Sequence, residues 1–343
     1  MMRRTNHALA TRSVQDMTDA FGRVVRSARV SVTDRCNLRC RYCMPAQGME
    51  WIPRPDVLTR AEIARVVRVL AAGGVTDVRV TGGEPLMRRD LADILADVAA
   101  TPGVREVSIT TNGVLLADHL DDLVRAGLSR VNISVDSLDP DRFEAVTRRR
   151  DLDRVLDGLE ACERHPGLGV TKVNAVLLRG IGEPDVLPLA EMARTRRLVV
   201  RFIEAMPLDA DGTWEAGTVI PGAELRAAIA RRWPLVPAGR ERPSAPATRW
   251  FFADGVGELQ FVSSVTEPFC AACDRVRVTA DGQLRTCLFA TAETDLRGPL
   301  RDGTGDDAMG DIVRRAVAGK PAGHGIGLPG WRYEGRPMSR IGG

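Results

Sequence analysis

The sequence lacks any apolar run approaching the ~20 residues that a membrane-spanning helix needs, so we expect no membrane partner. Its N-terminus, Met1–His7, is basic but is not followed by the hydrophobic segment of a signal peptide, which predicts a cytoplasmic protein. Net charge is also nearly absent, since 48 basic side chains face 45 acidic ones and leave only +3. That balance gives no reason to expect nucleic acid as a partner.

Histidine is scarce, with four residues in 343, whereas cysteine occurs seven times. In a reducing cytoplasm, such cysteines are more often metal ligands or catalytic thiols than disulfide partners. Six of them form two triplets, C-x3-C-x2-C and C-x2-C-x13-C, and no histidine lies close in sequence to either. Cys162 stands alone on a helix-period segment and is expected in the core. The triplets are Cys36, Cys40 and Cys43, and Cys270, Cys273 and Cys287.

The number of ligands separates two interpretations of these triplets. A structural zinc site takes four protein ligands. Each triplet offers three thiols, so zinc would need a further ligand from a distant part of the chain. Three thiolates on a four-iron cluster instead leave one iron with an open position, where a substrate or cofactor can bind. We therefore favour two iron–sulfur clusters and keep zinc as the alternative.

Strand and helix patterns alternate over the first two-thirds of the chain. The helical segments each carry one apolar stripe, as at Ile63, Val66, Val67 and Leu70. Such alternation predicts βα units and a parallel sheet. Six strands are expected, at Arg29–Thr33, Asp77–Thr81, Val107–Thr111, Ser129–Val135, Thr171–Leu177 and Leu198–Ile203.

These strands are too polar for a sheet that is covered on both faces. Strands buried on both faces should read as nearly continuous apolar runs, yet here valine and isoleucine alternate with polar residues. A closed eight-stranded barrel fills its interior with branched side chains. The pattern therefore favours an α/β fold with an incomplete (β/α)6 parallel barrel around a polar cavity.

The βα rhythm stops after Met206. Short strands are expected at Trp250–Ala253 and Glu258–Val262, and Asp281-Gly282 predicts a hairpin turn. We expect a β-rich appendage that closes the open side of the barrel. The predicted domains are an N-terminal extension (1–27), the partial barrel (28–206) and a C-terminal domain with the second cysteine triplet (207–343).

Three cations lie on the polar faces of different predicted strands: Arg29, Arg79 and Lys172. Burying unpaired cations costs several kcal/mol each, so they require anions. Internal acids such as Asp136, Glu84 or Glu204 are one possible source. A bound polyphosphate is the other, because Arg and Lys both bind phosphate well.

Two motifs flank the predicted cavity. Cys36-x3-Cys40-x-Tyr42-Cys43 follows the first strand, and Gly82-Gly83-Glu84-Pro85 follows the second. Paired glycines allow backbone to approach a ligand closely, and Glu84 can accept hydrogen bonds from an ammonium group. Together the motifs resemble those of the radical SAM (S-adenosylmethionine) superfamily. The resemblance implies a [4Fe-4S] cluster on Cys36, Cys40 and Cys43, which cleaves SAM to methionine and a 5′-deoxyadenosyl radical.

Over nearly the whole chain the sequence resembles one family within that superfamily, molybdenum cofactor biosynthesis protein A, the GTP 3′,8-cyclases. The second triplet, in the context Phe269-Cys270-x2-Cys273-x-Arg275-x-Arg277, is the most specific feature. The other matching motifs are Phe21-Gly22-Arg23, Arg29–Asn37, Arg79–Asp90, Thr110–Gly113, Arg201–Glu204 and Ile341-Gly342-Gly343.

The resemblance implies two [4Fe-4S] clusters, the second on Cys270, Cys273 and Cys287, where the guanine base binds. It implies that the Gly342-Gly343 tail reaches into the active site. Residues expected to contact SAM are Tyr42, Gly83, Glu84, Ser134 and Met206. Residues expected to contact GTP are Arg29, Arg79, Thr110, Lys172, Arg275, Val276 and Arg277.

The implied reaction begins when the radical takes hydrogen from ribose C3′ of GTP, after which C3′ attacks guanine C8. Arg275 or Arg277 is the expected catalytic proton source or electrostatic partner. Implied partners are a low-potential donor of flavodoxin type, a downstream cyclic pyranopterin monophosphate synthase and a second copy in a homodimer.

Two rivals remain. A radical SAM peptide maturase usually needs more C-terminal cysteines, and a zinc-stabilised regulatory or nucleic-acid-binding protein would carry a basic surface. The run Arg148–Arg150 is interpreted as solvated charge.

Overall fold

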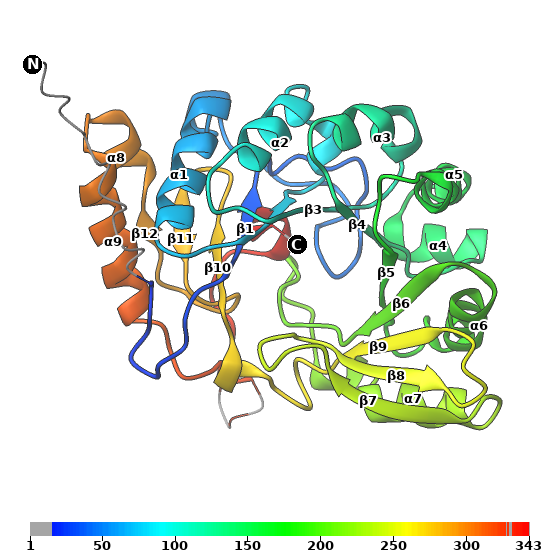
Figure 1. The fold of residues 1–343 in the computed structure, drawn as a ribbon. Helices are drawn as coiled ribbons and strands as arrows, with labels where there is room; N and C mark the ends of the chain where they lie inside the picture. The colour runs from blue at the N-terminus through cyan, green and yellow to red at the C-terminus, as the bar shows by residue number, and fades with distance from the viewer. Residues whose placement is uncertain (1–15, 327, 329–330, 343) are drawn as a thin grey trace, which may run out of the picture.

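A computed structural model describes residues 16–326, 328 and 331–342. Its centre is six parallel strands in sequence order, joined by helices that lie on one side of the sheet (Figure 1). Every expected strand is present, with ends shifted by at most two residues. The strands are β1 (Ser27–Ser31), β2 (Asp77–Thr81), β3 (Glu106–Thr111), β4 (Arg130–Ser134), β5 (Thr171–Val176) and β6 (Leu198–Ile203). The helices are α1 (Arg60–Ala72), α2 (Leu91–Ala99), α3 (Leu116–Arg125), α4 (Pro140–Thr147), α5 (Leu152–Arg164) and α6 (Val186–Thr195).

The C-terminal region extends this sheet at both edges. β10 runs parallel to β1, and β9 runs parallel to β6. The strand order is β12-β11-β10-β1-β2-β3-β4-β5-β6-β9-β8-β7, so the described sheet is mixed and open, with β12 and β7 at its edges. The added strands are β7 (Leu235–Arg240), β8 (Thr248–Phe252), β9 (Glu258–Val262), β10 (Arg275–Val278), β11 (Gln283–Arg285) and β12 (Thr294–Asp295). The added helices are α7 (Gly222–Ala230), α8 (Arg297–Arg301), α9 (Asp306–Ala318) and α10 (Met338–Ile341).

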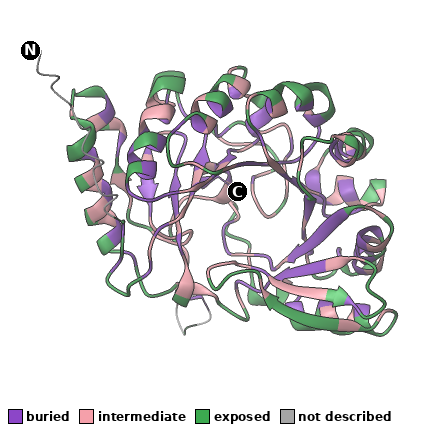
Figure 2. Cartoon of the chain, viewed as in Figure 1, coloured by how far each residue is buried: buried purple, intermediate pink, exposed green. Residues whose placement is uncertain are grey.

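The apolar stripes of the helices form the core, as the sequence predicts. In α1 the predicted stripe is buried, and Thr59 caps the helix in a reciprocal capping box with Glu62. Val30 and Val80 are fully buried under the helices, whereas Arg29 and Arg79 face the other way. Figure 2 shows burial concentrated along the strands and on the inner sides of the helices. The alternation therefore separates a packed outer face from a polar inner face.

Cys162 is 3% exposed and belongs to the core, as expected for the stray cysteine. Among the residues that the structure describes, no helix is long and apolar enough to cross a membrane.

Candidate active site

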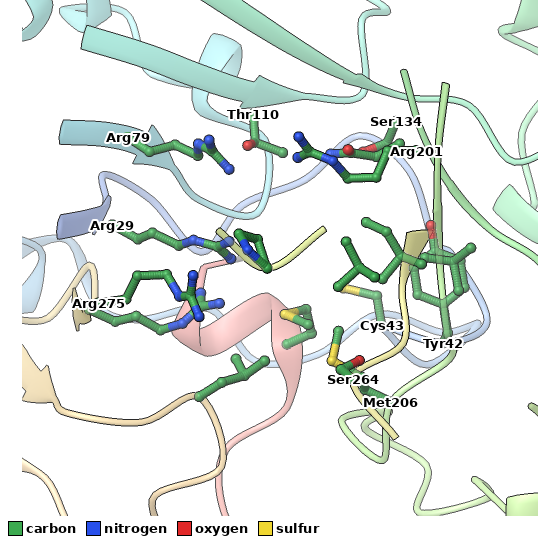
Figure 3. A pocket seen from close by; sticks show the side chains of 18 of the residues that line it. Arg29, Tyr42, Cys43, Arg79, Thr110, Ser134, Arg201, Met206, Ser264 and Arg275 are labelled. Carbon is green, nitrogen blue, oxygen red and sulfur yellow. The ribbon is translucent and has the colours of Figure 1, made fainter. Parts of the chain in front are cut away.

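One cavity of about 280 Å³ brings together residues from almost the whole length of the chain. Both cysteine triplets line it, with Cys36, Cys40 and Cys43 on one wall and Cys270, Cys273 and Cys287 on another. Figure 3 shows Arg29, Arg79 and Arg275 at one end and Tyr42, Cys43 and Met206 at the other. The cavity is therefore divided into a cationic end and a sulfur-rich end. Other predicted site residues on its wall are Gly83, Thr110, Ser134 and Arg277.

The first triplet occupies the loop that follows β1, at the carboxyl end of the strands. The loop folds back on itself, because Cys43 N donates to Cys40 O at 3.0 Å. Leu38 N donates to Cys36 Sγ at 3.4 Å, and the Asn112 amide approaches the same sulfur at 3.9 Å. Tyr42 Oη donates to Asp136 at 2.7 Å, which fixes the aromatic ring beside the thiols.

These thiols fit an iron–sulfur cluster and are poorly suited to ionise on their own. All three are unbridged cysteines that line the cavity. Burial, with Glu84 as the next cause, raises the pKa of Cys36 to about 11. Burial and Cys36 raise the pKa of Cys43 to about 12. Thiolates at these positions therefore need a positively charged partner, which the iron of a cluster supplies.

Glu84 does not line the cavity, contrary to the contact with SAM that the sequence suggested. Its carboxylate is fully buried and accepts from Leu86 N at 3.0 Å, Thr111 Oγ1 at 2.7 Å and Asn112 N at 2.7 Å. Burial raises the pKa of Glu84 to about 7. These bonds join the Gly-Gly turn after β2 to the end of β3, so Glu84 braces the wall of the cavity from behind.

The cationic end is built by strand register. Arg29 pairs with Arg79 on β2 and with Arg277 on β10, so three arginines stand side by side on adjacent parallel strands. Burial lowers the pKa of each guanidinium, and neighbouring cations lower it further, to about 10 for Arg79 and about 9 for Arg277. Arg29 is shifted well below its ordinary pKa by burial, then by Arg277 and Arg79. Like charges in register are destabilising, which indicates that an anion belongs here.

The three acids named from the sequence, Asp136, Glu84 and Glu204, do not supply that anion. Asp136 accepts from Tyr42 Oη and from Val176 N, and Glu84 is occupied as described. Glu204 accepts from Gly222 N, Val265 N and the Thr266 hydroxyl. Among the residues described here, no ion pair joins these carboxylates to Arg29 or Arg79. The structure thus favours the polyphosphate alternative.

A side chamber of about 100 Å³ continues the cationic end toward the start of the strands. Lys172 lines this chamber, and Arg29, Arg79 and Arg275 line both spaces. Arg201, which sequence analysis did not place in the site, lines both as well and donates to Gln260 Oε1 at 2.7 Å. Burial lowers the pKa of Lys172 to about 7 and that of Arg201 to about 9. The sequence signal was one cation inside the apolar strand Leu198–Ile203.

The second triplet sits in cationic surroundings. Arg275 donates to Cys273 Sγ at 3.4 Å, and Arg23 donates to Cys270 O at 2.8 Å. Lys320 donates to Arg275 O at 2.7 Å and also to Thr286 O, next to Cys287. Burial alone would raise the pKa of Cys273, yet Arg275 and Lys320 outweigh it and hold the pKa below its ordinary value. Arg23 and Lys320 are positioning residues that sequence analysis did not assign.

His324 is a further cavity residue that the sequence did not indicate, because it lies far along the chain from both triplets. It lines the same cavity as the second triplet. Its Nδ1 accepts from Ile326 N at 3.3 Å, and its ring packs edge-on against Phe289 at 4.9 Å. Within the described ranges, no three His, Cys, Asp or Glu side chains converge on a position for a single metal ion.

The C-terminal segment enters the cavity wall beside both triplets. Met338 lines the cavity, Ser339 Oγ approaches Cys43 O at 3.4 Å, and Gly342 O accepts from Arg277. A Cβ on Gly342 would lie 2.5 Å from Thr81 Oγ1, so only glycine fits. Gly343, the last residue of the expected tail, lies outside the described residues.

Val276 corrects another expectation. Its side chain is 1% exposed and packs in the hydrophobic core, between two arginines that face the cavity. Strand alternation turns every second side chain of β10 away from the site, so Val276 offers no side chain to a ligand.

Two family models match the chain. The radical SAM superfamily model covers residues 30–193, and the Molybdenum Cofactor Synthesis C model covers residues 198–326. The boundary between them falls just before β6, close to the point where the βα rhythm ends. The protein is therefore an enzyme of the radical SAM superfamily, for which SAM and a [4Fe-4S] cluster are the expected cofactors.

Full-length relatives narrow the class. The chain is 46% identical to a GTP 3′,8-cyclase of Mycobacterium sp. (strain KMS) over 95% of its own length and 93% of the relative's. It is 46% identical to that of Streptomyces coelicolor, covering 95% and 96%, and 43% identical to that of Corynebacterium glutamicum, covering 95% and 89%. The chain belongs to the GTP 3′,8-cyclase family, which carries out the first step of molybdenum cofactor biosynthesis.

A solved structure supports the fold alone. SuiB of Streptococcus suis bound to S-adenosylmethionine superposes with a TM-score of 0.56 at 13% identity, covering 84% of this chain and 68% of that one.

Proposed function

We propose that this protein converts GTP to (8S)-3′,8-cyclo-7,8-dihydroguanosine 5′-triphosphate, with two [4Fe-4S] clusters and SAM. One observation carries the proposal: two cysteine triplets and a row of unneutralised arginines line a single cavity. The arginines call for a polyanion, and the second triplet beside them offers metal ligands. GTP meets both demands, since it carries a triphosphate as well as a guanine base that can bind a metal.

The architecture that fits this task is a partial barrel of β1 to β6 with the C-terminal region closing its open side. β9 and β10 flank the barrel strands, and the segment between them carries Cys270 and Cys273. We propose domain limits of 28–206 and 207–343, with 1–27 as an N-terminal extension. In this arrangement the two cluster sites face each other across the substrate.

The first triplet and its neighbours form the proposed SAM site. Cys36, Cys40 and Cys43 would hold the cluster, which with SAM bound supplies the 5′-deoxyadenosyl radical. Tyr42, Gly83, Ser134 and Met206 line the adjoining wall. A side chain on Gly83 would lie 2.5 Å from the backbone oxygens of Asp34 and Arg35, so glycine lets this turn pack directly against the cysteine loop. Glu84 positions this turn from outside the cavity.

The second triplet and the cations form the proposed GTP site. Phosphates would lie against Arg29, Arg79, Arg201 and Lys172, buried cations that form no ion pair within the described residues. Thr110 lies on the adjoining wall. Cys270, Cys273 and Cys287 would hold the second cluster, which offers an iron to the guanine base.

Arg275 and Arg277 lie between these groups. Arg275 contacts the second triplet, and Arg277 joins the arginine row to the C-terminal segment. Burial and the neighbouring Arg275 lower the pKa of Arg277 to about 9, which favours Arg277 as the proton donor to the cyclised base. The product would pass to cyclic pyranopterin monophosphate synthase, a flavodoxin-type donor would supply electrons, and a homodimer is expected.

The test is anaerobic reconstitution with iron and sulfide, followed by incubation with SAM, dithionite and GTP. The proposal expects about eight irons per chain, 5′-deoxyadenosine that depends on GTP, and the cyclised nucleotide. SAM cleavage indifferent to GTP would remove the substrate assignment. Zinc at the second triplet with four irons at the first would remove the second cluster, and His324 would then be examined as the further ligand.

A further inference from the structure

The arginine run that sequence analysis interpreted as solvated charge has a structural task. Arg148 follows α4 with φ of 58°, the one non-glycine residue of the described chain in the left-handed region. Its guanidinium donates to Arg39 O and to Met44 O, both at 2.9 Å. These carbonyls belong to the loop that carries Cys40 and Cys43. The strained residue therefore ties α4 to the first cysteine triplet.

The same loop and helix end are joined at further points. Arg39 N donates to Thr147 O at 2.9 Å, and Arg41 N donates to Val146 O at 3.0 Å. The Arg41 side chain donates to Ala145 O at 2.7 Å. Four arginines are thus held in one contiguous surface that we call the arginine patch. It consists of Arg39, Arg41, Arg148 and Arg149.

No carboxylate of the described residues pairs with any member of the arginine patch. Nearby arginines on the same helix region are neutralised, since Arg142 pairs with Asp185 and Arg150 pairs with Glu144. Arg41 and Arg149 are exposed, whereas Arg39 lies over the Trp51 ring at 5.4 Å. The uncompensated charge is therefore local to the loop that surrounds the first triplet.

The substrate does not account for this charge. The proposed phosphate end lies toward the start of the strands, where the side chamber is lined by Ser27, Asp77 and Arg130. The cysteine loop follows the carboxyl end of β1. The arginine patch borders the cavity wall made by Cys36, Cys40 and Cys43 but lines neither space. It therefore lies outside the cavity.

We propose that the arginine patch is the docking surface for an acidic one-electron carrier protein that reduces the first cluster. The inference rests on the proposed function, since the cleavage of SAM consumes one electron at that site. One electron leaves the reduced carrier, which is oxidised by one electron, and enters the cluster through the loop that the patch surrounds. Complementary charge sets the encounter rate and the orientation of such a complex.

Binding is measured first, on the protein without its clusters. Oxidised flavodoxin, an acidic carrier, is titrated at low ionic strength against the wild type and against the variant Arg149→Glu. Arg149 is exposed, lies outside the cysteine loop and donates from its side chain to the neighbouring Arg148 O, so the fold should tolerate the change. We expect affinity about threefold weaker in Arg149→Glu, and wild-type affinity that falls as salt is raised. Arg231→Glu is the matched control, because Arg231 is also exposed and has no carboxylate partner among the described residues but lies after α7.

Turnover then separates this inference from the function on which it rests. With dithionite as reductant, Arg149→Glu and the wild type should form product at equal rates. With reduced flavodoxin, only Arg149→Glu should slow, by about the factor lost in binding. Equal affinities for the wild type and Arg149→Glu, or an equal loss in Arg231→Glu, would overturn the docking surface. Absence of product from the wild type with dithionite would instead remove the proposed cyclase, whatever flavodoxin binds.

Discussion

The two cysteine triplets share a cavity and a ligand chemistry but lie in opposite electrostatic surroundings. At the first, burial dominates and Glu84 and Asp136 add negative charge, so the thiol pKa values rise. At the second, Arg275 and Lys320 pull the pKa of Cys273 below its ordinary value despite burial, although burial raises the pKa of Cys270. The first site therefore needs a bound cation to hold thiolates, whereas at the second the chain itself favours negative charge at Cys273.

This difference matches two tasks. The proposed site of electron delivery to SAM benefits from a tightly enclosed loop, held here by α4 and the C-terminal segment. A site beside a triphosphate shares its cations with the substrate, and Arg275 serves both the sulfur and the phosphate end. Removing one triplet should therefore have a different consequence from removing the other.

Replacing single ligands gives the largest expected effect. Cys36→Ser should abolish 5′-deoxyadenosine formation, because the SAM cluster loses one of its three thiolates. Cys270→Ser should keep SAM binding at the first site but lose GTP-dependent deoxyadenosine and the cyclised product, because only the guanine site is damaged. Iron content, SAM binding, deoxyadenosine and nucleotide product are measured together, and Cys162→Ser serves as the control cysteine. Loss of SAM binding in both variants alike would contradict the division of labour.

The next largest effect is expected from replacing Arg23, whose hydrogen bonds support the second triplet. Arg23 donates to Cys270 O, Ala322 O and Pro321 O while paired with Asp19. Arg23→Gln leaves buried carbonyls unsatisfied, and we expect a loss of about 1–3 kcal/mol in unfolding free energy. Iron content should fall at the second site and remain at the first. Arg26→Gln is the control, since its ion pair with Asp16 is half exposed. Equal iron loss from both sites would show that Arg23 acts on the whole fold.

A smaller effect on product formation is expected from filling the space beside Gly342 in the C-terminal segment. Gly342→Ala puts a methyl group 2.5 Å from Thr81 Oγ1 and displaces the carbonyl that Arg277 holds. We expect product formation to fall about tenfold by misplacing the proton donor, with SAM binding retained. Gly255→Ala has a similar positive φ but open space around it, and so isolates backbone strain from the clash. If both variants lose activity equally, the contact with Arg277 is not what matters.

Local patterns in the sequence were enough to predict β1 to β6 and the three inward cations. Alternation of valine with polar residues determines which side of a strand faces a cavity, and that information is local. The pairing of β10 with β1 is not local, and with it the alignment of Arg29 beside Arg277 was not predictable. His324 and Arg23 were also not predictable from local patterns. Each lies beside the second triplet only because distant parts of the chain meet in the C-terminal region.

Two residues of the predicted site turn their side chains away from the cavity, and for the same reason. Glu84 and Val276 lie in the right motifs, but a motif does not say which way a side chain turns. The Glu84 carboxylate accepts hydrogen bonds from Thr111 and Asn112, which lie much further along the chain. Val276 lies on β10, a strand that the sequence predicts. Two-residue alternation along that strand already places the Val276 side chain on the opposite face from Arg275 and Arg277.

The cationic end should be visible in the pH dependence of GTP binding. Burial lowers the pKa of Lys172 to about 7, assisted by Arg201 and Arg130 and opposed by Glu241. A bound phosphate favours the charged lysine and raises this pKa, so GTP binding takes up a proton above pH 7. Affinity should then weaken as pH rises from 7 to 9, by at most about tenfold per unit. Below pH 7 the lysine is already charged and contributes no slope.

Calorimetry at pH 8 in two buffers of different ionisation enthalpy measures the proton uptake directly. Lys172→Met should bind GTP more weakly at pH 7 and should lose the part of the slope that belongs to the lysine. The γ-phosphate titrates identically in both proteins, so the difference between them isolates Lys172. An unchanged slope in Lys172→Met would place the phosphates away from the side chamber, with Arg29 and Arg79 alone as their partners.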